Sequence, residues 1–96
     1  MMLNGKQKRY LRSLANTIKP VFQIGKDGLN ENVYESIKQA LKSKELIKIN
    51  VLKTCELSIN EIIIDILANT NSELVQKIGK TIVLYKQSKE KIIKLP

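Results

Sequence analysis

Histidine and tryptophan are absent from the 96-residue sequence, and cysteine occurs once, as Cys55. Histidine is the most frequent general base in enzymes, so its absence removes the usual partner that would activate Ser13 or Ser58 as a nucleophile. A single cysteine can form neither an internal disulfide nor a zinc site of paired cysteines. The sequence therefore predicts a protein that is not an enzyme and that uses no metal or other cofactor.

Aromatic residues and long apolar runs are also scarce. Aromatic side chains make up 4% of the sequence, as Phe22 and three tyrosines. The last expected strands lack the aromatic pair with which RNA-recognition motifs stack bases, so base stacking on aromatic side chains of a sheet is not expected. No stretch reaches the ~18 apolar residues of a membrane span, and the N-terminus has no apolar signal core. Together with the single cysteine, these absences favour a reduced, cytoplasmic setting and no membrane partner.

Positive charge is in excess, with 17 lysine and arginine residues against 9 aspartate and glutamate residues. Residues 1–29 carry six cations and one anion, residues 30–71 carry five and six, and residues 72–96 carry six and two. If the two basic ends meet in the fold, they form one surface that suits a polyanion such as nucleic acid. The same excess can serve solubility alone. Fifteen of the cations are lysine, which favours contact with phosphates over the reading of base edges.

A first helix is expected over about residues 4–18, and Pro20 ends it. Asn4 and Gln7 have the spacing of a capping box. Apolar side chains then recur at helical spacing on one face: Leu3, Leu11, Leu14, Ala15 and Ile18. The outer side of this helix is cationic, with one flank formed by Lys8, Arg12 and Lys19, and with Lys6 and Arg9 further round.

The rest of the chain is expected to alternate between strands and helices. A short buried strand over 21–24 leads through a glycine loop to a helix that Asn30 caps and that ends near Lys44. A strand over 46–52 places Lys48 and Asn50 on the face opposite its isoleucines. A capping box at Ser58 begins a third helix, which ends at 69–71. Strands over 74–78 and 81–86 follow, joined by a Gly79-Lys80 turn of type II′.

The order α-β-α-β-α-β-β predicts an α/β fold with a four-stranded mixed sheet. Right-handed crossovers place the second and third helices on the same face of that sheet. We expect one compact domain over residues 1–96, with a core over about 3–86 and a basic tail over 87–96 that is partly mobile.

The segment from Ile24 to Asn30 holds the most informative motif, a strand that runs through Gly25-Lys26-Asp27-Gly28 into a helix N-terminus. Two glycines allow the backbone to approach a ligand closely, and a helix N-terminus offers amide N–H groups to phosphate. Gly-x-x-Gly loops clamp nucleic-acid backbones in KH domains. The motif is short, so an ordinary turn that needs glycine for its geometry stays open. Since the basic first helix directly precedes this strand, the two are expected to share a surface.

Four ordered segments give the chain a resemblance to the CRM (chloroplast RNA splicing and ribosome maturation) domain family, and above all to its bacterial single-domain YhbY-type members. These segments cover residues 3–12, 19–29, 45–48 and 78–85. The resemblance implies a fold like the C-terminal domain of translation initiation factor three, no enzymatic activity, and binding to structured RNA. The implied RNA is a precursor of large-subunit ribosomal RNA, or the precursor particle itself, bound during ribosome assembly by what is expected to be a monomer.

Carried over by position, the resemblance places the RNA contact at Gly25, Lys26, Asp27 and Gly28 and at the basic residues near them, with Lys80 added from the hairpin turn. Asp27 departs from the neutral polar residue that the family often has there, which is expected to weaken a phosphate contact. Two other functions stay open, namely a DNA-packaging protein and a ribosome-associated adaptor that binds protein instead of RNA.

Overall fold

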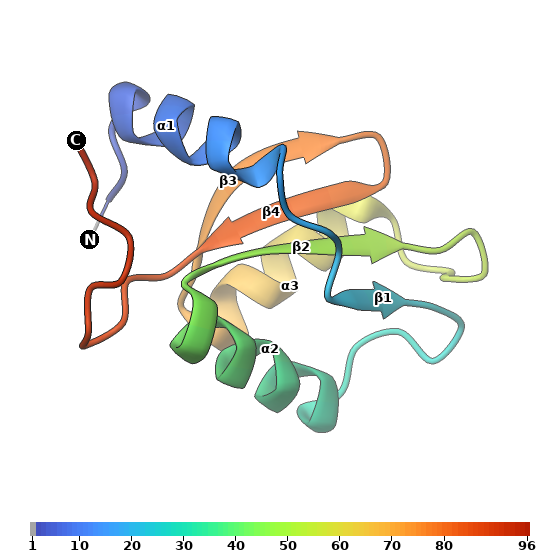
Figure 1. Ribbon diagram of the computed structural model, residues 1–96. Helices are drawn as coiled ribbons and strands as arrows, with labels where there is room; N and C mark the ends of the chain where they lie inside the picture. Colours follow the sequence, from blue (N-terminus) through green and yellow to red (C-terminus); the bar gives the residue numbers. More distant parts are fainter. Residues whose placement is uncertain (1) are drawn as a thin grey trace.

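Four strands form one mixed sheet in the computed structural model, which describes residues 2–96 (Figure 1). The strands are β1 (Phe22–Ile24), β2 (Leu46–Val51), β3 (Glu73–Ile78) and β4 (Thr81–Tyr85), in the order β1-β2-β4-β3. β1 runs parallel to β2, and β4 is antiparallel to both of its neighbours. The helices are α1 (Gly5–Ala15), α2 (Glu31–Lys44) and α3 (Ile59–Thr70). The element order and the mixed sheet predicted from the sequence are therefore confirmed.

Helices α2 and α3 cover one face of the sheet, as the crossover rule predicted (Figure 1). Ile37 and Leu41 of α2 and Ile62 and Ile66 of α3 are almost completely buried against this face. The sheet contributes every second residue of its central strands: Ile47, Ile49, Val51, Ile82 and Leu84. Each fully buried side chain of this size contributes about 1.5–3 kcal/mol relative to exposure, so this layer is the main core.

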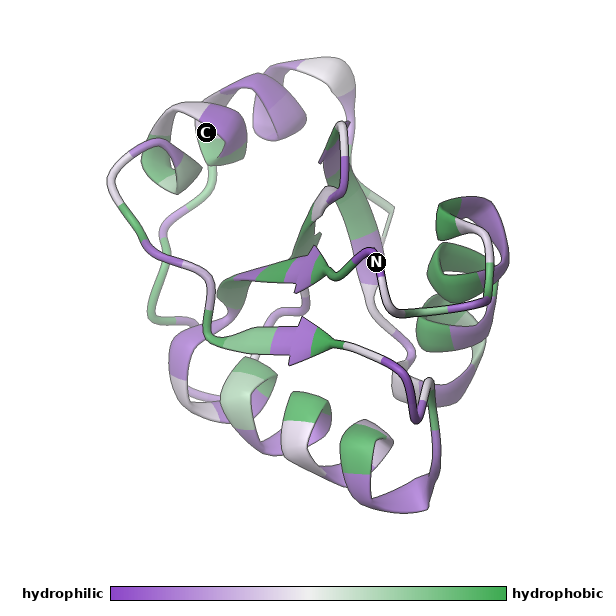
Figure 2. Cartoon of the chain, turned by 90° about the vertical axis from the view of Figure 1, so that its right-hand side faces the viewer, coloured by the Kyte–Doolittle hydropathy of each residue, from purple (hydrophilic) through white to green (hydrophobic). Residues whose placement is uncertain are grey.

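Helix α1 packs on the opposite face and forms a second, smaller core. Leu11 and Ala15 of α1 pack there with Leu46 of β2, Val83 of β4 and Val75 of β3. Strand β4 is therefore buried on both of its faces, which explains its continuous apolar sequence. Figure 2 looks at the sheet from its end and shows apolar residues concentrated on the strands and on the helix sides that face them.

The helix ends follow the capping signals of the sequence. Asn4 and Gln7 exchange the two hydrogen bonds of a capping box at the start of α1, at 3.0 and 2.8 Å. Asn30 caps α2 by accepting the Val33 N–H, and Ser58 caps α3. Helix α1 is shorter than expected, because it ends at Ala15 and the chain turns at Asn16 and Thr17 before reaching Pro20. β1 is also less buried than expected, since it is an edge strand with Gln23 exposed.

Residues 87–96 correct the expectation of a partly mobile tail. The segment folds back over the start of β2, where it hydrogen-bonds to the buried carboxylate of Glu45. Ile93 and Leu95 of the tail pack against the α1 core, and the Gln7 amide donates to the Pro96 carbonyl. The tail is thus a packed part of the domain, and Pro96 lies beside the first turn of α1.

None of the helices described within residues 2–96 is both long and apolar enough to cross a membrane.

Candidate nucleic-acid interface

Three connections meet at one end of the sheet, which we call the loop end. They are the β1–α2 loop (25–30), the β2–α3 loop (52–58) and the Gly79-Lys80 turn. Backbone hydrogen bonds tie them together, from Leu52 N–H to the Ile24 carbonyl and from Val51 N–H to the Lys80 carbonyl, both at 2.8 Å. Gly79 has φ +56° and Lys80 does not have a positive φ, as the predicted type II′ turn requires. The glycine loop and the hairpin turn therefore lie at the same end of the sheet, on opposite sides of β2.

The glycine loop is a tight turn in which the Gly28 N–H donates to the Gly25 carbonyl at 3.0 Å. Gly28 has φ +65°, a conformation that favours glycine, and a Cβ on Gly25 would contact Leu52 and Thr54 at 3.4 Å. The positive φ of Gly28 thus accounts for that glycine, as the alternative of an ordinary turn requires.

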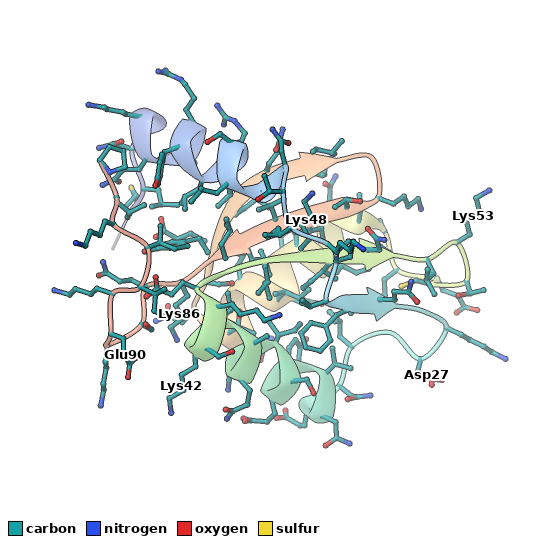
Figure 3. The ribbon with its side chains drawn as sticks, in the orientation of Figure 1. Asp27, Lys42, Lys48, Lys53, Lys86 and Glu90 are labelled. Atoms are coloured by element: carbon teal, nitrogen blue, oxygen red, sulfur yellow. The ribbon has the colours of Figure 1, made fainter. Side chains whose placement is uncertain are left out.

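The residues between the two glycines carry the chemistry of the loop. Lys26 and Asp27 are exposed at its tip, and Figure 3 shows Asp27 extending away from the domain. Within residues 2–96 the main-chain N–H groups of these two residues make no hydrogen bond. The loop therefore presents two amide donors and a lysine beside the N-terminus of α2, a combination that suits a phosphate.

The cations predicted on the first helix lie along the outer side of α1. Lys6 and Arg9 are exposed, and Lys8 and Arg12 are half-buried. Figure 3 shows nitrogen-tipped side chains extending outward from this helix. Lys19 is exposed in the link between α1 and β1, near Lys44 and the start of β2. Among residues 2–96 the one ion pair joins Glu35 and Lys38, so the α1 cations have no acidic partner within the described chain.

The predicted site residues thus form two groups. Lys26 and Lys80 both belong to the loop end, on opposite sides of β2, and Asp27 follows Lys26. The cations of α1 lie over the part of the sheet that is nearer the chain termini, and Lys19 lies below them. The expected sharing of one surface between α1 and the glycine loop therefore stays a prediction.

Two further lysines lie near these groups. Lys53 is exposed in the β2–α3 loop, next to the glycine loop. Lys48 is half-buried on the α1 side of β2, between α1 and the loop end (Figure 3). The alternation of residues in the strand predicted the polar face that holds Lys48. The position of Lys53 next to the glycine loop could not be predicted, because the 52–58 and 25–30 loops are far apart in the sequence and no local pattern indicates their contact.

Another group of charged side chains lines a groove elsewhere on the described surface. The groove between α2 and the tail has mixed charge, with Lys42, Lys86 and Glu90 among its lining residues (Figure 3). Cys55 is half-buried against the main core. Among residues 2–96 no three histidine, cysteine, aspartate or glutamate side chains lie together as metal ligands would.

Comparisons with known proteins show the family to which the chain belongs. The model of the CRS1 / YhbY (CRM) domain family matches residues 3–86, and the chain belongs to that family. A Bacillus subtilis (strain 168) protein named "Probable RNA-binding protein YqeI" is 52% identical over 96 residues, which cover 99% of this chain and 100% of the relative. A Haemophilus influenzae protein named "RNA-binding protein" is 41% identical, and the match covers 98% of this chain and 95% of that protein.

A solved structure shows the same fold. The solution structure of the hypothetical protein SAV1595 from Staphylococcus aureus superposes with a TM-score of 0.80 at 52% sequence identity. The match covers 99% of this chain and 100% of that one. The α/β architecture described above is therefore shared along the full length of both proteins.

Proposed function

We propose that this protein is a non-catalytic RNA-binding protein that acts on precursor ribosomal RNA, or on the precursor particle of the large ribosomal subunit. The observation that carries the proposal is the set of cations on α1 and at the loop end, which have no acidic partner among residues 2–96. Unpaired lysine and arginine side chains attract a polyanion and release its counterions on contact. Relatives over nearly the whole chain are named as RNA-binding proteins, which favours RNA as that polyanion.

The contact surface in this proposal has two parts. Lys6, Lys8, Arg9 and Arg12 of α1, with Lys19, bind phosphates along one strand of the RNA. The glycine loop clamps a phosphate with Lys26 and the free amides of residues 26 and 27, and Lys80 belongs to the hairpin turn at the same end of the sheet. Lysine dominates this set, so affinity depends on charge and shape more than on base sequence.

The test measures RNA affinity as a function of salt concentration. Substituting Lys8, Arg12 and Lys19 by glutamine should weaken binding for all RNA sequences and flatten the salt slope by about 0.7–0.9 per lost contact. The matched control substitutes three exposed lysines on α2 and the tail, Lys42, Lys89 and Lys91. Equal losses in the two triple variants would reduce the proposal to non-specific charge attraction. Tighter binding to duplex DNA than to structured RNA would favour the DNA-packaging alternative.

The ribosomal assignment needs a test in cells. Crosslinking followed by sequencing of the bound RNA should enrich precursor sequences of the large-subunit RNA over those of the small subunit. Association with ribosomal particles that survives the Lys8, Arg12 and Lys19 substitutions would instead favour a protein-binding adaptor.

A further inference from the structure

Helix α1 covers only half of its face of the sheet. The covered half holds Leu46, Val75, Val83 and Tyr85, all of which are buried. The strands extend beyond α1 toward the loop end, where that face carries no helix (Figure 1). The strand register places one residue of each strand in a row across this uncovered part: Gln23, Asn50, Thr81 and Ile78.

The row combines amide and aliphatic side chains. Gln23 of β1 and Ile78 of β3 are exposed, the latter at 51% of its surface. Asn50 is held in place because its side-chain oxygen accepts a hydrogen bond from the Thr81 hydroxyl at 2.8 Å. Leu52 follows β2 directly and is 37% exposed, and its Cδ1 atom lies 3.4 Å from the position of a Cβ on Gly25.

Lysines surround these polar and aliphatic side chains. Lys48 lies on the same face of β2 as Asn50 and toward α1, and Lys26, Lys53 and Lys80 belong to the loops at the end of the strands. The surface therefore places cations around a centre that offers hydrogen bonds and apolar contact. This is the chemistry that an unpaired nucleotide requires, since its phosphate needs a cation, its base edge needs a donor or acceptor, and its base face is apolar.

We propose that the uncovered half of the sheet, formed by Gln23, Asn50, Ile78 and Leu52, binds unpaired nucleotides next to the glycine loop. The inference rests on the proposed function and specifies which form of RNA the loop end takes. An RNA duplex presents mainly phosphates and 2′-hydroxyls in its accessible minor groove, so it would leave Ile78 and Leu52 without a complementary surface. The bases would contact aliphatic instead of aromatic side chains, which is compatible with the scarcity of aromatic residues.

The experiment compares an RNA single strand with the duplex that it forms with its complement. The test variant is Gln23→Ala with Ile78→Ser, because both side chains are exposed. The matched control is Gln39→Ala with Ile64→Ser, which removes the same side-chain types from exposed positions of α2 and α3, on the other side of the sheet. Affinity for both RNAs and thermal stability are measured for each protein.

The test variant should lose about fivefold in affinity for the single strand, which is near the lower limit of the loss expected for one base contact. Its affinity for the duplex, which is weaker from the start, should stay unchanged. The control should match the unsubstituted protein on both RNAs. Unchanged single-strand affinity in a folded test variant, or an equal loss on the duplex, would overturn this inference and leave the proposed function standing. Failure of the unsubstituted protein to bind either RNA at low salt would overturn both.

Discussion

Charged side chains are buried and hydrogen-bonded at one end of the sheet and exposed to solvent at the other. At the end that holds both chain termini, the Glu45 carboxylate is completely buried and accepts four hydrogen bonds, from the amides of Ser88, Ile92 and Ile93 and from the Ser88 hydroxyl. Glu73 nearby accepts the Leu3 N–H at 2.7 Å. At the loop end, by contrast, the lysines are exposed and have no acidic partner within residues 2–96.

This contrast separates charge that stabilises the fold from charge that is available to a ligand. A buried carboxylate is tolerated only when hydrogen bonds replace the water that it loses, and these bonds join the tail to the start of β2. Exposed lysines contribute little to stability, so their concentration at the loop end and on α1 has no evident structural cause. Removing the buried charge of Glu45 should therefore destabilise the fold, and removing charge from the loop end should affect only binding.

The largest effect is expected for Glu45→Gln, which should lower the free energy of unfolding by about 2–4 kcal/mol. The amide keeps the shape but loses the negative charge, and its NH2 group cannot accept the tail's N–H groups. Urea unfolding measures the loss. The matched control, Glu90→Gln, changes an exposed glutamate of the tail and should stay within about 0.5 kcal/mol of the unsubstituted protein. Two variants of equal stability would show that the four hydrogen bonds do not hold the tail.

Acid should remove the same contribution without a substitution. Burial raises the pKa of Glu45, but the hydrogen bonds from Ser88, Ile93 and Ile92 outweigh it and hold the pKa below its ordinary value. The stabilisation is thus complete above the ordinary carboxyl pKa and is lost as pH falls through the lower pKa of the folded state. The stability gap between the unsubstituted protein and Glu45→Gln should narrow from neutral pH to about pH 3. A gap that widens on acidification would contradict the assigned direction.

At the loop end, Gly28→Ala should cost about 1 kcal/mol in stability, because Gly28 has φ +65° and a Cβ strains that conformation. Gly5→Ala is the control, since Gly5 begins α1, has open space around its Cβ position, and lacks a positive φ. Alanine at position 5 should be neutral or slightly stabilising. Thermal unfolding distinguishes them, and equal melting temperatures would mean that the turn relaxes around a side chain.

The smallest expected changes leave the fold intact and alter only RNA binding. Lys26→Ala should weaken binding by about 1 kcal/mol, as for one charge-assisted contact. Asp27→Asn should strengthen it by less, because a negative charge beside the bound phosphate disappears. Neither should move the melting temperature, since both side chains are exposed. Unchanged affinity in both variants would leave the loop with a purely structural role.

Sequence reasoning found the elements because their signals are local. The caps at Asn4, Asn30 and Ser58 each act on an amide three residues away, and the alternation in β2 correctly separated Lys48 and Asn50 from the isoleucines. The prediction of a partly mobile tail was wrong. The local sequence of the tail is basic and indicates exposure to solvent, whereas the carboxylate to which it hydrogen-bonds lies more than 40 residues earlier in the chain. Sequence spacing also gave no sign that α1 and its core bury the side chain of Tyr85.

By itself the sequence determined the order of helices and strands, the position of each cap, the glycine loop and the placement of the cations, because each follows from residues within one or two turns of the chain. The tertiary structure alone decided that α1 stops short of the loop end, that three loops meet there, and that Glu45 is surrounded by donors from the tail. These features depend on how far one packed layer overlaps another, and that overlap is set by contacts between residues that lie far apart in the sequence.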